Sequence, residues 1–201
     1  MIHVVVAEEM GLLRSALCAA LSSEEDIEVV ADAAGLGQLW EALRRERPDV
    51  LVLELKADAP ESALDVGRVL AETPRTAVLA MSHRWNPPLV EAAVTAGVRG
   101  LLSKSVAMPE LVRAVRTTAA GERVIDPSAA AAVLSPPANP LTRRELEVLR
   151  VAAEGLPLKE IARRLFLAHG TVRNHLSAIL HKTGTRNRME AVRLAQRDGW
   201  L

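Results

Sequence analysis

The sequence predicts an α/β domain built on a five-stranded, doubly wound parallel sheet (residues 1–119), then a linker (120–138) and a separate all-α domain of four helices (139–201). Three observations support this division. Short apolar runs alternate with amphipathic stretches in the first part, only helical periodicity appears in the last part, and three of the eleven prolines lie between them. A length of 201 residues is sufficient for two small domains.

Five apolar runs in the first part are typical of strands. They are His3–Ala7, Ile27–Ala31, Val50–Leu55, Thr76–Met81 and Gly100–Ser103. The amphipathic stretches that follow them are Gly11–Leu21, Leu36–Arg45, Ala63–Ala71, Pro88–Ala96 and Pro109–Ala119. Because the runs are apolar throughout, helices should cover both faces of a parallel sheet. The functional crevice of such a sheet lies at the carboxyl ends of its strands.

The segment 120–138 has a different composition from either domain. It combines an alanine run with a Pro-Pro pair. We interpret it as a short connector that is partly helical, and low-complexity disorder is the alternative.

The last part contains four helical patterns. Thr142 and Glu145 have the spacing of a capping box, in which each side chain bonds the backbone N–H of the other residue, and Gly155 is a typical helix end. The further helices are predicted over Leu158–Leu165, over Thr171–Lys182 and from Asn187 to about Asp198. Two short helices joined by a tight turn that contains Gly170 predict a helix-turn-helix.

The second helix of this motif is predicted to face DNA. Its outward residues are Thr171, Arg173, Asn174, Ser177, His181 and Lys182. Arg and Asn can read guanine and adenine by paired hydrogen bonds, whereas Thr171 and Lys182 suit phosphate oxygens. Residues 139–201 carry 12 basic and 6 acidic side chains, and residues 1–138 carry 13 and 19. This asymmetry favours nucleic-acid binding by the second domain, although a solvated polar helix face would give the same pattern.

Other functional classes find little support in the residues. The sequence contains no nucleophile–base–orienter set, no glycine-rich phosphate loop and no cluster of metal ligands, so we do not expect an enzyme. It contains neither an uninterrupted apolar run of about 20 residues nor a secretory signal, so we expect no membrane partner and a cytoplasmic protein. Cys18, the single cysteine, is interpreted as a small core residue.

Residues 141–191 closely resemble the LuxR-type helix-turn-helix of the NarL/FixJ class of response regulators. The matching segments are LTxRExEVL (141–149), AxG (153–155), EIAxxL (160–165), GTVRNHLSxI (170–179), Lys182 and RxxA (188–191). The resemblance implies that Arg173, Asn174 and Ser177 face bases, that Thr171 and Lys182 contact the DNA backbone, and that the last helix lies in a dimer interface. Ala168 departs from the family, which usually has a capping Ser there, worth about 0.5–2 kcal/mol.

The first domain resembles a receiver domain, which has the flavodoxin-like fold. In that family two acidic residues after strand one bind Mg²⁺, and an Asp that ends strand three accepts phosphate from a histidine kinase. A Ser or Thr after strand four and a Lys after strand five contact the phosphoryl group. At these positions this chain has Glu8 and Glu9, Glu54, Ser82 and Lys104.

Glu54 is the most serious departure from the receiver pattern, because it adds a methylene and moves the carboxylate by about an ångström. The aromatic residue usual three positions before the Lys is also absent, replaced by Leu101. We therefore expect no conventional aspartyl phosphorylation, weak or absent Mg²⁺ binding, no other cofactor, and doubt about a histidine kinase partner. Either Glu54 reaches toward the phosphoryl position and pairs with Lys104 or Ser82, or it is a tolerated relic.

Taken together, these features predict a sequence-specific transcription regulator. The family resemblance implies a homodimer that binds an inverted-repeat promoter site on double-stranded DNA. The alternative is a regulator whose receiver-like domain is a small-molecule sensor.

Overall fold

The computed structural model describes residues 1–57, 62–134 and 138–201, with the side chains of 62–65 excepted. The chain divides into two compact units, Met1–Ser135 and Pro136–Leu201. No helix of the described part is long and apolar enough to cross a membrane.

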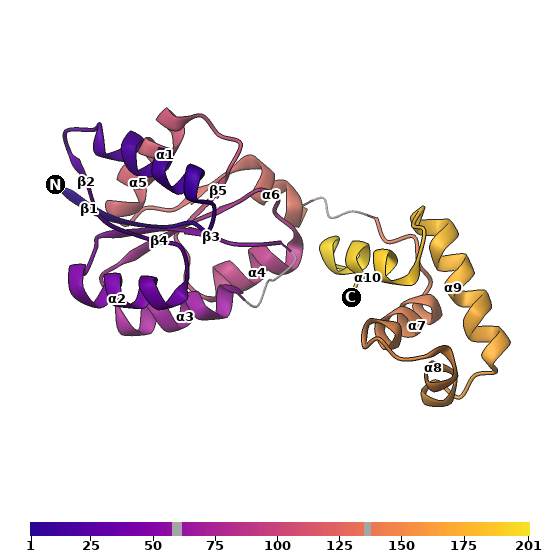
Figure 1. The fold of residues 1–201 in the computed structure, drawn as a ribbon. Coiled ribbons are helices and arrows are strands. Elements are labelled where there is room, and N and C mark those ends of the chain that lie inside the picture. The colour runs from indigo at the N-terminus through magenta and orange to yellow at the C-terminus, as the bar shows by residue number, and fades with distance from the viewer. Residues whose placement is uncertain (58–61, 135–137) are drawn as a thin grey trace. The chain divides into compact units, whose positions relative to one another are not determined.

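The first unit is built on one parallel sheet (Figure 1). Its strands are β1 (Ile2–Ala7), β2 (Ile27–Ala33), β3 (Val50–Glu54), β4 (Ala77–Ser82), β5 (Gly100–Ser103) and β6 (Val124–Ile125). They are arranged in the order β2-β1-β3-β4-β5-β6, and every neighbouring pair is parallel. The order reverses at β1, which begins the chain and lies between β2 and β3, so a crevice is expected where β1 and β3 end.

Helices cover both faces of the sheet, as the sequence predicts (Figure 1). On one face are α1 (Gly11–Ser22) and α5 (Met108–Ala119), and on the other are α2 (Leu36–Glu46), α3 (Ser62–Glu72) and α4 (Pro87–Thr95). Alternate residues of a strand enter different cores. Val4 and Val6 pack with α1 and α5, whereas Val5 and Ala7 pack with α2 and α4. Both faces of the strands are therefore buried, which explains their unbroken apolar runs.

The segment expected to be a linker differs from the prediction. Val124 and Ile125 form β6, which pairs with β5 and makes the sheet six-stranded instead of five-stranded. The helix α6 (Pro127–Leu134) follows, and its Ala129 is fully buried in the core of the first unit. A two-residue strand and an alanine run show no clear periodicity, so the sequence did not reveal them. Residues 135–137 of the predicted linker lie outside the described part.

The second unit consists of four helices, as predicted. They are α7 (Arg143–Ala153), α8 (Leu158–Arg164), α9 (His169–Thr183) and α10 (Arg188–Arg197). Thr142 and Glu145 form the expected capping box at the start of α7. The core contains Val148 and Leu149 of α7, Ile161 of α8 and Val172 and Ile179 of α9, so the helix-turn-helix packs against α7 on its apolar side.

Candidate functional site

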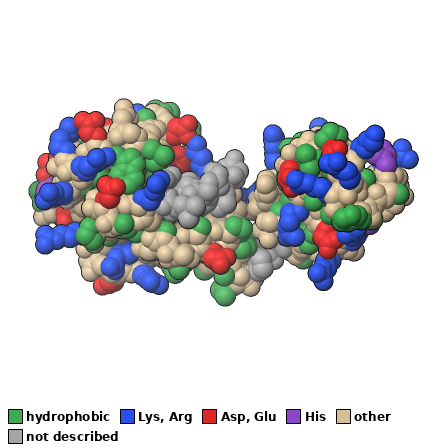
Figure 2. Space-filling view, turned by 90° about the horizontal axis from the view of Figure 1, so that it is seen from below, with side chains coloured by type: hydrophobic (Ala, Val, Ile, Leu, Met, Phe, Trp, Pro, Cys, Tyr) green, Lys and Arg blue, Asp and Glu red, His purple; other side chains and the backbone are tan. Residues whose placement is uncertain are grey.

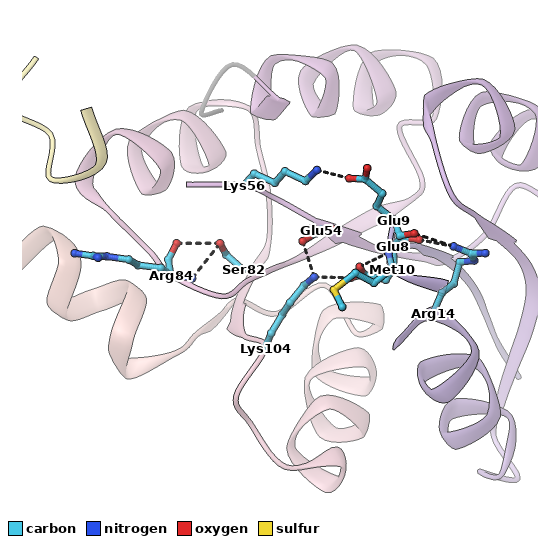
Figure 3. A network of polar contacts seen from close by, with 9 residues as sticks. All are labelled: Glu8, Glu9, Met10, Arg14, Glu54, Lys56, Ser82, Arg84 and Lys104. Carbon is cyan, nitrogen blue, oxygen red and sulfur yellow. Dashed lines mark hydrogen bonds and ion pairs between the residues drawn. The ribbon is translucent and has the colours of Figure 1, made fainter. Parts of the chain in front are cut away.

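A charged cluster occupies the crevice at the carboxyl ends of β1, β3 and β5 (Figure 3). Glu8 directly follows β1, Glu54 ends β3 and Lys104 directly follows β5. The Lys104 Nζ atom donates to Glu8 Oε2 and to Glu54 Oε1, and both distances are 2.6 Å. The side chains of Lys104 and Glu8 are each 2% exposed and that of Glu54 is 13% exposed. One buried ammonium thus holds two carboxylates.

The ionisation of Glu54 depends on this lysine. Burial raises the pKa of Glu54, but the hydrogen bond and charge of Lys104 outweigh burial, so the net pKa of Glu54 lies below its ordinary value. Glu54 is therefore ionised at neutral pH.

The two acidic residues after β1 do not act as a pair. Glu8 points into the cluster and also accepts a hydrogen bond from the Met10 backbone N–H at 2.9 Å. Glu9 is exposed and forms an ion pair with Lys56, which follows β3 (Figure 3). Consecutive side chains leaving a strand point to opposite sides, which separates the two carboxylates. The sequence placed both at one site, and the structure brings only Glu8 together with Glu54.

In the part of the chain that the structure describes, Ser82 forms no hydrogen bond with Glu54. Its hydroxyl donates to the backbone carbonyl of Arg84 at 2.9 Å, although Ser82 ends β4 beside β3. Of the two partners that the sequence offered for Glu54, the structure selects Lys104.

The receiver family implies a Mg²⁺ ion in this crevice, and the residues present do not fit one. Mg²⁺ requires near-octahedral oxygen ligands at about 2.0–2.1 Å. Here the carboxylates of Glu8 and Glu54 share the ammonium of Lys104, and Glu9 is directed to Lys56. Within the described residues, no group of three or more acidic, His or Cys side chains could hold a metal ion.

The second candidate site is the outer face of α9. Arg173, Asn174, Ser177, His181 and Lys182 are exposed and Thr171 is half-buried. Val172, Leu176 and Ile179 are buried on the opposite face. The helix therefore presents the predicted polar residues along its outward side. Figure 2 shows Lys and Arg side chains spread over the surface of this unit.

Lys182 has a partner that the sequence did not reveal. Its Nζ atom donates to Glu145 Oε2 at 2.7 Å and joins the end of α9 to the start of α7. The same oxygen accepts from the backbone N–H of Thr142 at 2.7 Å. Burial raises the pKa of Glu145, but the Lys182 and Thr142 hydrogen bonds lower it more. The side chain of Lys182 is 35% exposed. It therefore bonds Glu145 and is still accessible to solvent.

The start of α9 lacks a side-chain cap, as the sequence predicts. Ala168 occupies the N-cap position, and no side chain caps the helix. His169 does not compensate, because it is the first residue of the helix itself.

Arg188 of α10 lies beside the outer face of α9. A groove of about 390 Å³ is lined by Leu158, Arg173, Leu176, Ser177, Leu180 and Arg188. The Arg188 guanidinium donates to the Leu156 carbonyl at 2.7 Å, which holds it in place. The sequence assigned Arg188 only to the dimerisation helix, because residues far apart on a chain give no sign of sharing a groove.

Comparison with known proteins agrees with both units. Residues 4–116 match the response regulator receiver domain, and residues 139–195 match the bacterial regulatory proteins of the luxR family. Response regulator RamR of Streptomyces coelicolor is 39% identical over 100% of this chain and 98% of its own length. Transcriptional regulatory protein DesR of Bacillus subtilis is 34% identical over the full length of both chains.

Solved structures show the same fold. RcsB in a complex described as two dimers bound to two parallel DNAs has a TM-score of 0.69 at 20% identity, covering 97% of this chain and 98% of that chain. ChrA, the response regulator of a heme-sensing two-component system, has a TM-score of 0.57 at 29% identity, covering 100% and 98%. From the two domain matches and the full-length relatives, we conclude that this chain belongs to the LuxR family of response regulators and is a DNA-binding transcription factor, not an enzyme.

Proposed function

We propose that this regulator binds a specific promoter site as a homodimer and acts without aspartyl phosphorylation. One observation carries the proposal: Lys104 bonds Glu54, at the expected phosphoacceptor position, and Glu8 at the same time. The acceptor position is thus occupied by a longer carboxylate that is already paired.

The geometry disfavours phosphoryl transfer to Glu54. A nucleophile misplaced by about 1 Å can lose about a hundredfold in rate, and the extra methylene shifts the carboxylate by that order. The transfer would also require a Mg²⁺ site, and the pairing of Glu8 and Glu54 with Lys104 and of Glu9 with Lys56 weighs against one. On this proposal, a histidine kinase is not a necessary partner.

The ion pair supplies a permanent link in place of a phosphoryl group. It ties the end of β3 to the end of β5, across β4. In a receiver, the phosphoryl group on the residue that ends β3 is contacted by the Lys after β5. The Glu54 carboxylate makes that connection without a modification, and we propose that it biases the domain toward the dimerising state.

On DNA, Arg173, Asn174 and Ser177 would read base edges while Thr171 and Lys182 position the helix on phosphates. His181 lies further along the same exposed face. Two copies would place their α9 helices about one helical turn apart on an inverted repeat. The RcsB structure, whose description reports dimers on DNA, supports this arrangement by its similar fold.

Treatment with acetyl phosphate and Mg²⁺ tests the proposal. Phosphate-affinity electrophoresis detects modification, light scattering measures the dimer fraction, and DNA obtained by in-vitro selection measures affinity. We expect wild type to remain unmodified, with the same dimer fraction and DNA affinity as without treatment. Modification of wild type, or DNA affinity that rises on treatment, would contradict the proposal.

Three variants refine this test. Glu54→Gln keeps the shape but removes the charge, so we expect a lower dimer fraction and weaker DNA binding. Glu9→Gln, which alters an exposed carboxylate in the same crevice, is the matched control and should behave as wild type. Modification of Glu54→Asp alone would show that the extra methylene blocks transfer. If Glu54→Gln dimerises and binds DNA like wild type, the ion pair does not set the active state.

The sensor alternative is not favoured at this crevice. The hollow beside Glu8, Glu54 and Lys56 has a volume of about 170 Å³, whereas pockets for small ligands usually have about 300–1,000 Å³. A ligand there would also have to displace charged side chains that already have partners.

A further inference from the structure

A larger hollow lies at the opposite edge of the sheet, where β3 and β4 begin. It has a volume of about 580 Å³ and is lined by Leu43, Arg44, Arg47, Pro48, Asp49, Glu72, Thr73, Pro74, Arg75 and Thr76. These residues come from the end of α2, the end of α3 and the turns that lead into the two strands. The volume falls within the usual range for a small-molecule site.

Three arginines line this hollow without an ionic partner. In the described part of the chain, Arg44, Arg47 and Arg75 form no ion pair, although Asp49 and Glu72 line the same hollow. Asp49 is engaged elsewhere, because it accepts the His3 backbone N–H at 2.8 Å. The guanidiniums therefore retain most of their donors for a ligand.

The two threonine hydroxyls of the hollow are already hydrogen-bonded. The Thr76 hydroxyl donates to the Pro48 carbonyl at 2.8 Å, and the Thr73 hydroxyl donates to the Val69 carbonyl at 2.7 Å. Free donor capacity is thus concentrated in the three guanidiniums, which lie beside the carboxylates of Asp49 and Glu72. Pro48, Pro74 and Leu43 add apolar walls. Guanidiniums match the oxygens of phosphate in paired hydrogen bonds.

Arg47 occupies an unfavourable backbone conformation. Its φ of 46° lies in the left-handed region, where a side chain costs about 1 kcal/mol or more and glycine is preferred. It caps the end of α2 through its N–H to the Leu43 carbonyl. Stability alone would favour glycine at this position.

We propose that this hollow, defined by Arg44, Arg47 and Arg75, binds a small phosphate-bearing anion. The arginine side chains would hold the ligand, because the carboxyl-terminal ends of α2 and α3 themselves favour cations. Both helices begin at the crevice edge, where Glu8, Glu54 and Lys104 lie, so ligand binding would stiffen elements that border the ion-pair cluster. The receiver-like unit would then respond to a metabolite at a surface separate from the crevice.

Calorimetric titration of the full chain with inorganic pyrophosphate tests the site, and citrate serves as a carboxylate of similar charge. We expect saturable binding of pyrophosphate that is tighter than that of citrate. Arg47→Gly and Arg75→Ala should each weaken it by about tenfold. Arg47→Gly should be no less stable than wild type in thermal unfolding, because it relieves the left-handed strain.

Two controls locate the binding. Arg113→Ala removes an exposed arginine of α5, and Arg173→Ala removes one from the DNA-facing helix; both should bind pyrophosphate like wild type. Failure to observe saturable binding at concentrations up to about 10 mM would overturn the proposal. Unchanged affinity in both Arg47→Gly and Arg75→Ala would also overturn it, and tighter binding of citrate would overturn the phosphate assignment.

Discussion

Lys104→Met removes the cation that joins Glu8 and Glu54 and leaves the two carboxylates without it. Both carboxylates are buried, and a buried charge without its partner costs about 3–5 kcal/mol. Protonation limits that cost. A glutamate has an ordinary pKa of 4.5. Protonating it at pH 7 costs about 1.4 kcal/mol for each pH unit above that pKa, or about 3.4 kcal/mol in all.

The loss of stability should therefore depend strongly on pH. We expect Lys104→Met to lower the free energy of unfolding by about 3 kcal/mol at pH 7 and by under about 1 kcal/mol at pH 5, because protonation becomes easier. Urea unfolding followed by tryptophan fluorescence measures this. A Trp200→Phe background restricts the signal to Trp40 and Trp85, which belong to the first unit.

The double variant Lys104→Met with Glu54→Gln is the matched control. It removes the repulsion between the two carboxylates, and the remaining carboxylate of Glu8 keeps its bond to the Met10 N–H, so part of the stability at pH 7 should return. A loss for Lys104→Met below about 1 kcal/mol at pH 7, or the same loss at both pH values, would refute the reasoning.

Three further predictions concern the second unit. Ala168→Ser supplies the missing cap of α9 and should stabilise the unit by about 0.5–2 kcal/mol in thermal unfolding; no increase would mean that the helix start is already satisfied. Thr142→Ala removes the capping-box hydroxyl and should cost about 1 kcal/mol by the same measurement, whereas an unchanged transition would argue against the box in solution. Because the pKa of Glu145 is lowered, its ionised form contributes stability that is present above its ordinary value of 4.5 and lost as pH falls through the lower folded value. Circular dichroism of acid unfolding should show this loss of stability in wild type, and Glu145→Gln should make stability depend less on pH. An equal pH dependence in wild type and Glu145→Gln would be evidence against the Lys182 bond.

The main elements could be predicted because their signals are local. The inner strands β3 and β4 are buried on both faces and are therefore largely apolar. The helix cap at Thr142 follows from spacing alone. β6 and α6 could not be predicted, because Val124 and Ile125 are too few to show a period. The position of β6 is set by its pairing with β5. Sequence patterns do not show which strands pair.

The sequence suggested which residues form each candidate site, but not which of them bond to one another. A pair between Glu54 and Lys104 was one of the alternatives that the sequence left open. The second bond of Lys104, to Glu8, required the three strand ends to meet. The bond between Lys182 and Glu145 joins residues 37 positions apart, and each had a complete local explanation in the sequence. Such cross-links depend on tertiary packing, which single-sequence patterns do not reveal.

The bond between Lys182 and Glu145 should affect how DNA affinity changes with salt concentration. An ammonium carries three donors, and Lys182 gives one to Glu145. A phosphate that approaches the remaining donors also meets the repulsion of that carboxylate. Lys182 should therefore displace less than one condensed counterion from the duplex, and the logarithmic slope of affinity against salt should be shallower than the number of basic contacts implies.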